Sequence, residues 1–319
     1  MIRRAFTAVA LGAFLWSAAP VVSPAQVLSI MPLGDSLTWG YDGGPDTPAY
    51  LDSLDTGGYR SPLYSLLTAD HIGVTYVGVN NDNPSPVLTA AGQTAHNGFN
   101  GYTINEVDGN LAGSVSSADG VSNLGGYWLT GGGGTGRGPE TANVILLQIG
   151  ANDIGQGYDP LYNPSQPYNT AGESATQFAA DETTRLENLI NDIMYYEPNA
   201  TLLVDGTTPI INPFLGAAGT EVQDYGSDVD TLISTTYQNK SVHYVDMYDA
   251  FLLSGTSEVN SALFAGDGVH LTTQGYDVMA QTWDTAILAD VDLVPEPSTY
   301  GLFIGGALAL FVWRRKRTV

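Results

Sequence analysis

Serine, histidine and aspartate at three places in the chain form the combination that nucleophilic catalysis needs. Ser36 lies in the stretch IMPLGDSLTWG, directly after an apolar run, and Asp267 and His270 stand three residues apart in GDGVHLT. A serine hydroxyl is a weak nucleophile at neutral pH and needs a positioned base, and histidine can take and return its proton. An aspartate at the other ring nitrogen fixes the tautomer of that base. Ser36, His270 and Asp267 are therefore candidates for nucleophile, base and orienting acid.

Attack on a carbonyl also requires hydrogen-bond donors for the developing oxyanion. The candidate donors are the backbone N–H groups of Ser36 and Gly101 and the side-chain amide of Asn152. Gly101 lies in HNGFNGYTI, and Asn152 lies in IGAND, directly after the run VILLQI. Glycine suits this role because it lets the backbone approach a ligand closely. These donors and the three candidates above would together form one serine-hydrolase site.

Each of these residues also has a simpler interpretation. Ser36 or Asp267 could cap a helix, and Gly101 or Asn152 could merely form a turn. Asp35 and Asp153 are predicted to support the site through hydrogen bonds that hold their loops. The remaining histidines are scattered without metal-ligand spacing, so we expect neither a metal ion nor a cofactor.

The elements that must position these residues alternate along the chain. Strand-like apolar runs occupy residues 27–31, 74–79, 144–149, 201–204 and 242–245, and helical patterns occupy residues 61–69, 175–196, 222–237 and 273–288. Continuously apolar strands that alternate with helices predict a parallel sheet with helices on both faces. In such folds the chemistry gathers on loops at the carboxyl ends of the strands, where the candidate residues fall.

Two details of this pattern can be checked directly. In the second helix, apolar residues at helical spacing should face the core and leave Asp181, Glu182 and Arg185 outward. Two glycine-rich inserts, residues 41–58 and 111–140, interrupt the pattern. We expect them either to form the rim of the site or to be solvated surface loops.

The two ends of the chain differ from this pattern. Residues 1–25 carry Arg3 and Arg4, an apolar run and small residues, as a cleaved secretory signal does. The other end joins Pro-Glu-Pro at 295–297 to an apolar run of about 13 residues at 301–313, shorter than the roughly 20 that span a bilayer comfortably. A basic cluster, RRKR, follows. These features predict export and a marginal membrane segment at 301–313.

Charge limits the classes of ligand. The whole chain has a formal net charge of −23, and residues 26–294 hold 4 basic and 32 acidic residues, a net charge of about −28. Such a surface cannot replace phosphate counterions, which excludes nucleic acid as a partner, and it favours a neutral substrate. The chain has no cysteine, so its core must hold it together without disulfides.

Four motifs, GDSLT, HNGFNGYTI, IGAND and GDGVHLT, occur in an order that resembles the SGNH or GDSL hydrolase superfamily over nearly all of residues 26–290. The resemblance implies an α/β fold of flavodoxin-like type, a three-layer α/β/α sandwich around a parallel sheet. It also implies Gly101 rather than Gly98 as oxyanion donor. Within the superfamily the chain looks most like secreted acetyl-xylan esterases, although Ala151 and Leu271-Thr272 depart from the usual Thr and Pro-Asn.

The carboxyl-terminal end resembles the PEP-CTERM sorting signal. This resemblance implies transient membrane retention, cleavage by an exosortase, and delivery to the envelope surface or extracellular matrix of a Gram-negative bacterium. The domain organisation that we predict is a signal peptide at 1–25, a hydrolase domain at 26–293 and a sorting signal at 294–319.

The expected function is hydrolysis of acetyl esters on a neutral polysaccharide, with an acylated carbohydrate as substrate. A lipase, lysophospholipase or thioesterase of the same fold is one alternative, although the polar inserts do not suggest a long acyl groove. A surface protein that binds carbohydrate without turnover is another, but pure binding gives no physical reason for a complete nucleophile, base and oxyanion set.

Overall fold

The structure is a computed structural model of the chain. The residues that it describes are 27–45, 48–51, 54–112, 127–131, 140–158, 175–212, 218–238 and 240–291. They belong to one unit, Val27–Asp292. The predicted signal peptide and the predicted membrane segment at 301–313 lie outside the described residues. Within those ranges, no helix combines the length and apolar character needed to cross a bilayer.

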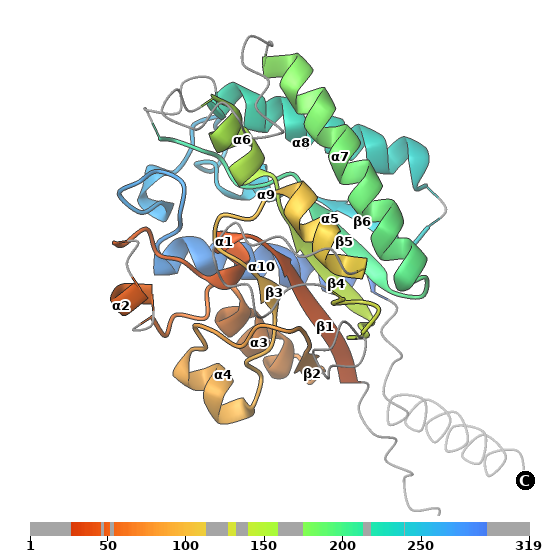
Figure 1. Ribbon diagram of the computed structural model, residues 1–319. Coiled ribbons are helices and arrows are strands. Elements are labelled where there is room, and N and C mark those ends of the chain that lie inside the picture. Colours follow the sequence, from red (N-terminus) through yellow and green to blue (C-terminus); the bar gives the residue numbers. More distant parts are fainter. Residues whose placement is uncertain are drawn as a thin grey trace, which may run out of the picture. The chain divides into compact units, whose positions relative to one another are not determined.

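A parallel sheet forms the centre of this unit (Figure 1). Its main path runs in the order β2-β1-β4-β5-β6, and every pair of neighbours is parallel. The bounds are β1 Val27–Gly34, β2 Gly73–Tyr76, β4 Val144–Gln148, β5 Thr201–Asp205 and β6 Val242–Val245. The two-residue strand β3, Asn97–Gly98, pairs with the last part of β1. All five predicted strands are therefore confirmed, as is their parallel arrangement.

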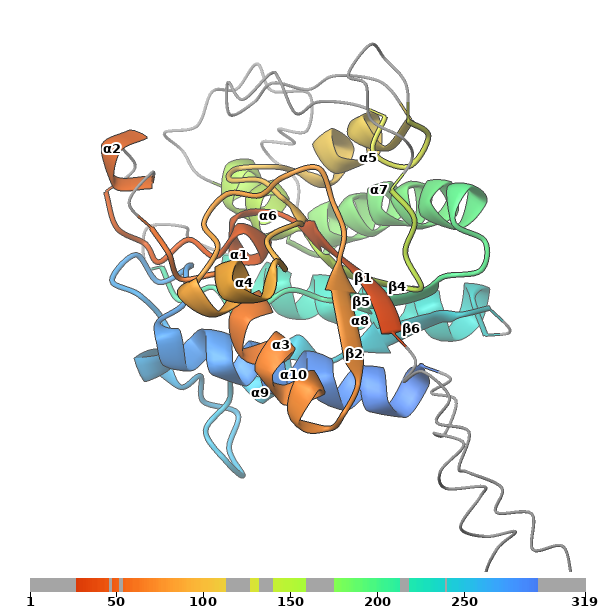
Figure 2. The ribbon, with the colours of Figure 1, turned by 90° about the horizontal axis from the view of Figure 1, so that it is seen from below.

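Helices cover both faces of the sheet, as the continuously apolar strands predict (Figure 2). Helices α5 (Ile104–Ala112), α7 (Ala175–Tyr196) and α8 (Ala218–Thr236) pack against one face through a buried cluster that includes Leu33, Leu147 and Ile190. Helices α3 (Arg60–Ala69) and α10 (Thr273–Asp290) pack together on the other face. The short helices are α1 (Ser36–Trp39), α2 (Pro48–Leu51), α4 (Pro86–Ala91), α6 (Ala151–Tyr158), α9 (Met247–Ala250) and a 3-10 turn at Ser261–Leu263. The three-layer α/β/α sandwich is confirmed.

One prediction about α7 is wrong. Its apolar residues Leu186, Ile190 and Ile193 are buried as expected, but Glu182 is also fully buried rather than outward. Arg185 does not point outward either, because its side chain is only 16% exposed and its Nε lies 3.5 Å from the buried Asp153. Helix α7 packs against α8 as well as against the sheet, so a second side of the helix is covered. Helical periodicity indicates the apolar face of a helix but does not show what packs beside that face.

Candidate active site

The break after β1 places Ser36 at the start of a one-turn helix. A side chain at Gly34 would collide with the backbone carbonyl of Gln148 in β4, so only glycine lets β1 end against its neighbour. The N-cap of α1 is Asp35, whose Oδ1 accepts the N–H of Leu37 at 2.9 Å. Ser36 is therefore not the capping residue, and its side chain makes a different contact.

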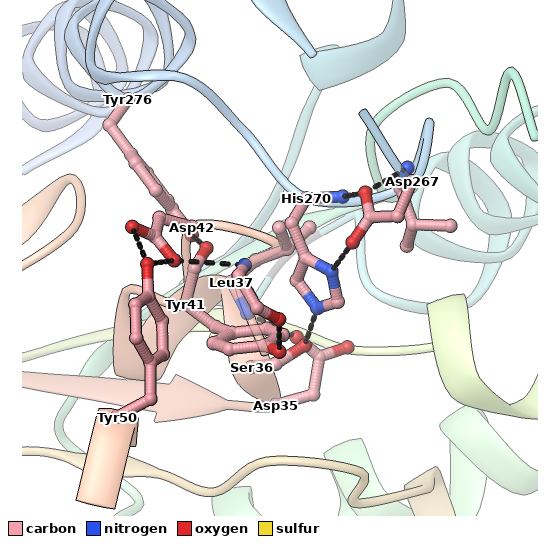
Figure 3. A network of polar contacts seen from close by, with 11 residues as sticks. Asp35, Ser36, Leu37, Tyr41, Asp42, Tyr50, Asp267, His270 and Tyr276 are labelled. Carbon is pink, nitrogen blue, oxygen red and sulfur yellow. Dashed lines mark hydrogen bonds and ion pairs between the residues drawn. The ribbon is translucent and has the colours of Figure 1, made fainter. Parts of the chain in front are cut away.

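Ser36, His270 and Asp267 form a chain of hydrogen bonds (Figure 3). Ser36 Oγ lies 2.8 Å from His270 Nε2, and His270 Nδ1 lies 2.6 Å from Asp267 Oδ2. The other carboxylate oxygen of Asp267 accepts the backbone N–H groups of Val269 and His270, both at 3.0 Å. The loop before α10 thus holds base and acid in one turn and presents them to the end of β1.

Asp267 is the charged member of this chain. Its burial acts to raise its pKa, but the hydrogen bonds from His270 and from the N–H of Val269 outweigh burial and lower the pKa to about 2. A carboxylate at this position favours the ring tautomer that carries its proton on Nδ1. The lone pair of Nε2 then faces the Ser36 hydroxyl, which is the arrangement that a general base requires.

The structure brings Asn152 and the loop of Gly101 together. Asn152 lies in the first turn of α6, and its Nδ2 donates to the carbonyl of Tyr102 at 2.9 Å. Gly101 has a φ of +77°, and a Cβ added there would meet nothing within 4 Å. The Cα of Gly101 therefore borders open space, in the loop whose next residue, Tyr102, accepts the Asn152 amide.

Gly98, the alternative glycine, has a different environment. Its N–H donates to His96 Nδ1 at 3.0 Å, and a Cβ there would lie 2.5 Å from the backbone nitrogen of Trp39. Gly98 is thus the close packing contact between its loop and α1, and its N–H is already engaged.

The two supporting aspartates are fully buried. Besides capping α1, Asp35 carries a pKa that burial raises to about 7. Asp153 Oδ2 accepts the N–H of Ile104 at 3.0 Å, which ties α6 to the start of α5, and Oδ1 lies 3.5 Å from Arg185 Nε. Burial raises the pKa of Asp153 to about 6 although Arg185 opposes that shift. Each side chain thus hydrogen-bonds the backbone where a helix begins, at α1 and at α5.

Sequence reasoning gave no role to Arg60, whose side chain is fully buried. Its Nη2 donates to the carbonyls of Trp39 at 3.0 Å and Asn83 at 3.1 Å, so the guanidinium joins the last residue of α1 to the loop before α4. Burial lowers the pKa of Arg60 to about 10. One available signal was that Arg60 is one of only four basic residues in 26–294.

His96 is also structural. Its Nε2 lies 3.0 Å from the carbonyl of Asp82, while Nδ1 accepts from Gly98. Burial holds the pKa of His96 well below its usual range, so the ring is neutral. Among the residues that the structure describes, no group of histidine, cysteine, aspartate or glutamate side chains is arranged to hold a metal ion.

The comparisons with known proteins agree with this architecture. The family model of the GDSL-like lipases and acylhydrolases matches residues 30–283, and the PEP-CTERM protein-sorting motif matches residues 293–317. A curated multidomain esterase of Ruminococcus flavefaciens is 26% identical over 275 residues, which is 84% of this chain. The match covers only 29% of that relative's length.

Two solved structures share the fold. A family 3 carbohydrate esterase of Clostridium thermocellum aligns with a TM-score of 0.52 and 22% identity, over 83% of this chain and 96% of that one. A carbohydrate esterase family 3 protein of Talaromyces cellulolyticus aligns with a TM-score of 0.50 and 17% identity, over 82% and 97%.

Fold, motifs and family match define a domain of the GDSL-like lipase/acylhydrolase type. The chain belongs to the GDSL-like lipase/acylhydrolase family. Its sorting motif indicates export in a Gram-negative bacterium.

Proposed function

We propose that this protein removes acetyl or similarly short acyl groups from a neutral polysaccharide through an acyl-enzyme on Ser36. The observation that carries the proposal is the hydrogen-bonded chain from Ser36 Oγ through His270 to Asp267. A hydroxyl in contact with a base that is itself oriented by a carboxylate is the arrangement that nucleophilic ester cleavage requires.

In the first half of the reaction, Ser36 Oγ attacks the acyl carbonyl while His270 Nε2 takes the hydroxyl proton. The tetrahedral intermediate collapses, the bond to the sugar oxygen breaks, and His270 returns the proton to that oxygen. In the second half, His270 takes a proton from water, whose oxygen attacks the acyl group on Ser36. Carboxylic acid leaves and Ser36 regains its proton, so no cofactor is consumed.

The oxyanion of each intermediate is bound by the N–H groups of Ser36 and Gly101 and by the side-chain amide of Asn152. The placement of Asn152 against the carbonyl of Tyr102 supports this assignment, because it fixes the amide beside the Gly101 loop. Donors fixed in advance stabilise the developing charge without reorganising during the reaction.

Charge supports a neutral substrate. Residues 26–294 carry about −28, a field that repels polyanions and does not oppose an uncharged acylated glycan. The likeness to carbohydrate esterases from Clostridium thermocellum and Talaromyces cellulolyticus supports a sugar ester, and the name of the Ruminococcus flavefaciens relative supports ester hydrolysis.

We further propose a route of delivery. Residues 1–25 act as a cleaved signal peptide, and residues 301–313 hold the chain transiently at the membrane. An exosortase then cleaves near the Pro-Glu-Pro motif and delivers the enzyme to the cell surface or extracellular matrix. The match of the sorting motif to residues 293–317 supports this route.

The test is acetate release from acetylated xylan by the purified protein, beside Ser36→Ala and a control, Ser65→Ala, which alters an exposed serine on α3. We expect release by the wild type and the control and a loss of roughly 10⁴-fold or more in Ser36→Ala. A preference for acyl chains of eight or more carbons would favour the lipase alternative. Binding of the glycan without release by any variant would favour a carbohydrate-binding protein.

A further inference from the structure

Tyr41, the first residue of the first glycine-rich insert, contacts both ends of the nucleophile–base pair. Its backbone N–H donates to the carbonyl of Ser36 at 3.0 Å, which closes α1. Its ring stands edge to face with the imidazole of His270, with centroids 4.5 Å apart and planes at 82° (Figure 3). Only 9% of Tyr41 is exposed, so this contact is packed inside the protein.

Two hydrogen bonds fix the position of Tyr41, and the residues that follow it pack against the same site. Its carbonyl accepts the hydroxyl of Tyr276, a buried residue of α10, at 2.6 Å. Its own hydroxyl donates to the carbonyl of Gly44. A Cβ at Gly43 would lie 2.8 Å from Asp267 Oδ2, so the next part of the insert packs against the carboxylate of the same site.

The two hydrogen bonds of His270 leave one motion of its ring open. They lie at Nδ1 and Nε2, and the imidazole can still tilt about the line through these atoms. A perpendicular aromatic ring in van der Waals contact opposes that tilt, and such pairs are favourable beyond the area that they bury.

We propose that Tyr41 is a positioning residue, whose ring holds the imidazole of His270 in the orientation that directs Nε2 at Ser36 Oγ. Tyr276 supports it by fixing the backbone of Tyr41 to the helix that follows His270. This inference rests on the proposed function of Ser36 and His270. It assigns the first residue of the insert a role in the active site rather than in a solvated surface loop.

Steady-state kinetics on p-nitrophenyl acetate test the proposal. In Tyr41→Leu we expect kcat to fall roughly 10- to 100-fold, because a small misplacement of a reacting group can lower the rate by this factor. KM should change less than about twofold. Tyr41→Phe keeps the ring and should retain kcat within about threefold. Tyr195→Leu, which alters a tyrosine that is 77% exposed, is the matched control. An unchanged kcat in Tyr41→Leu, or an equal loss in Tyr41→Phe, would overturn the proposal.

Tyr276→Phe serves if Tyr41→Leu does not fold. It removes the hydrogen bond to the Tyr41 carbonyl without touching His270, and we expect kcat to fall about threefold to tenfold at constant KM. Thermal unfolding of each variant shows that the fold is retained. A kcat equal to that of the wild type would contradict the supporting role of Tyr276.

A second measurement does not depend on turnover. The NMR signal of the proton between His270 Nδ1 and Asp267 reports how firmly the ring is held, and its loss in Asp267→Asn assigns it. We expect the signal in the wild type and Tyr41→Phe, and its loss through exchange in Tyr41→Leu. An unaltered signal in Tyr41→Leu would refute the positioning role. An inactive wild type that still shows this pattern would refute only the proposed function.

Discussion

Four aspartates lie at the carboxyl edge of the sheet, and they occupy two regions, an outer one beside His270 and an inner one that is buried. Asp267, beside His270, has a side chain that is 31% exposed and accepts two backbone N–H groups as well as the imidazole. The inner aspartates, Asp35, Asp153 and Asp205, are at most 1% exposed. Each accepts one backbone N–H, from Leu37, Ile104 and Thr207 respectively.

The pKa values of these aspartates therefore shift in opposite directions, although all of them lie near the same edge of the sheet. The pKa of Asp267 is lowered to about 2, whereas burial raises that of Asp153 to about 6, that of Asp35 to about 7 and that of Asp205 well above its usual range. Hydrogen-bond donors and partial hydration stabilise the outer charge, and desolvation penalises the inner ones. The outer aspartate can act electrostatically on a base, while the inner ones act as hydrogen-bonding braces.

The largest effect should come from neutralising the outer aspartate. In Asp267→Asn we expect kcat/KM on p-nitrophenyl acetate to fall roughly 10⁴-fold, because the amide favours the wrong imidazole tautomer. Asp205→Asn is the matched inner control and should change kcat/KM less than about threefold, since an asparagine oxygen can still accept the N–H of Thr207 and burial already disfavours a charge there. An equal fall in kcat/KM in the two variants would contradict the distinction between the outer aspartate and the inner aspartates.

A smaller effect should come from Asn152, which precedes the inner aspartate Asp153 in the chain and whose amide donates to the carbonyl of Tyr102. In Asn152→Ala we expect kcat to fall roughly 10²- to 10³-fold with little change in KM, because a donor to the oxyanion is lost. Stopped-flow kinetics can follow acyl-enzyme formation directly. A loss confined to KM would instead assign Asn152 to substrate binding.

The smallest effect concerns stability against pH. A carboxyl whose folded pKa is raised stabilises the fold fully below its unfolded value and loses that contribution as pH rises through the folded pKa. The inner aspartates Asp35 and Asp153 should therefore lower the melting temperature by roughly 5 °C between pH 5 and pH 8.5. Asp267 works in the opposite sense, but only as pH falls towards about 2.

Asp35→Asn tests this assignment, because an asparagine oxygen can still cap α1. Calorimetry should show a shallower decline with pH and a higher melting temperature than the wild type at pH 8.5. A decline that stays as steep as that of the wild type would assign the pH dependence to other groups, such as the buried Glu182.

The elements that the sequence predicted well are those with a strong apolar signal. Strands such as β4 are buried along their whole length, and such strands appear as unbroken apolar runs. The short elements were missed for the opposite reason. Strand β3 has two residues, Asn97 and Gly98, and α6 reads ANDIGQGY, in which glycine and asparagine have low helix propensity. Tertiary contacts impose these elements.

Glu182 and Tyr41 show which contacts the sequence could not predict. The predicted outward position of Glu182 failed because one helix can be covered on two sides. The contact of Tyr41 with His270 joins residues from opposite ends of the domain, and no spacing rule links them. The catalytic roles of the site residues, the boundaries of the segments 1–25, 26–293 and 294–319, and the place of delivery stay predictions.

The sequence by itself determined the order of the long strands and helices, the family motifs that contain Ser36, Asn152 and His270, and the sorting motif at the end. These depend on local pattern and residue type, which are written along the chain. Only the tertiary structure decided that the pKa of Asp267 is lowered while burial raises that of Asp35, that Gly98 packs closely against α1, and that the ring of Tyr41 packs on the imidazole. Charge, exposure and ring contacts depend on which distant segments of the chain pack together, and only the folded structure determines that packing.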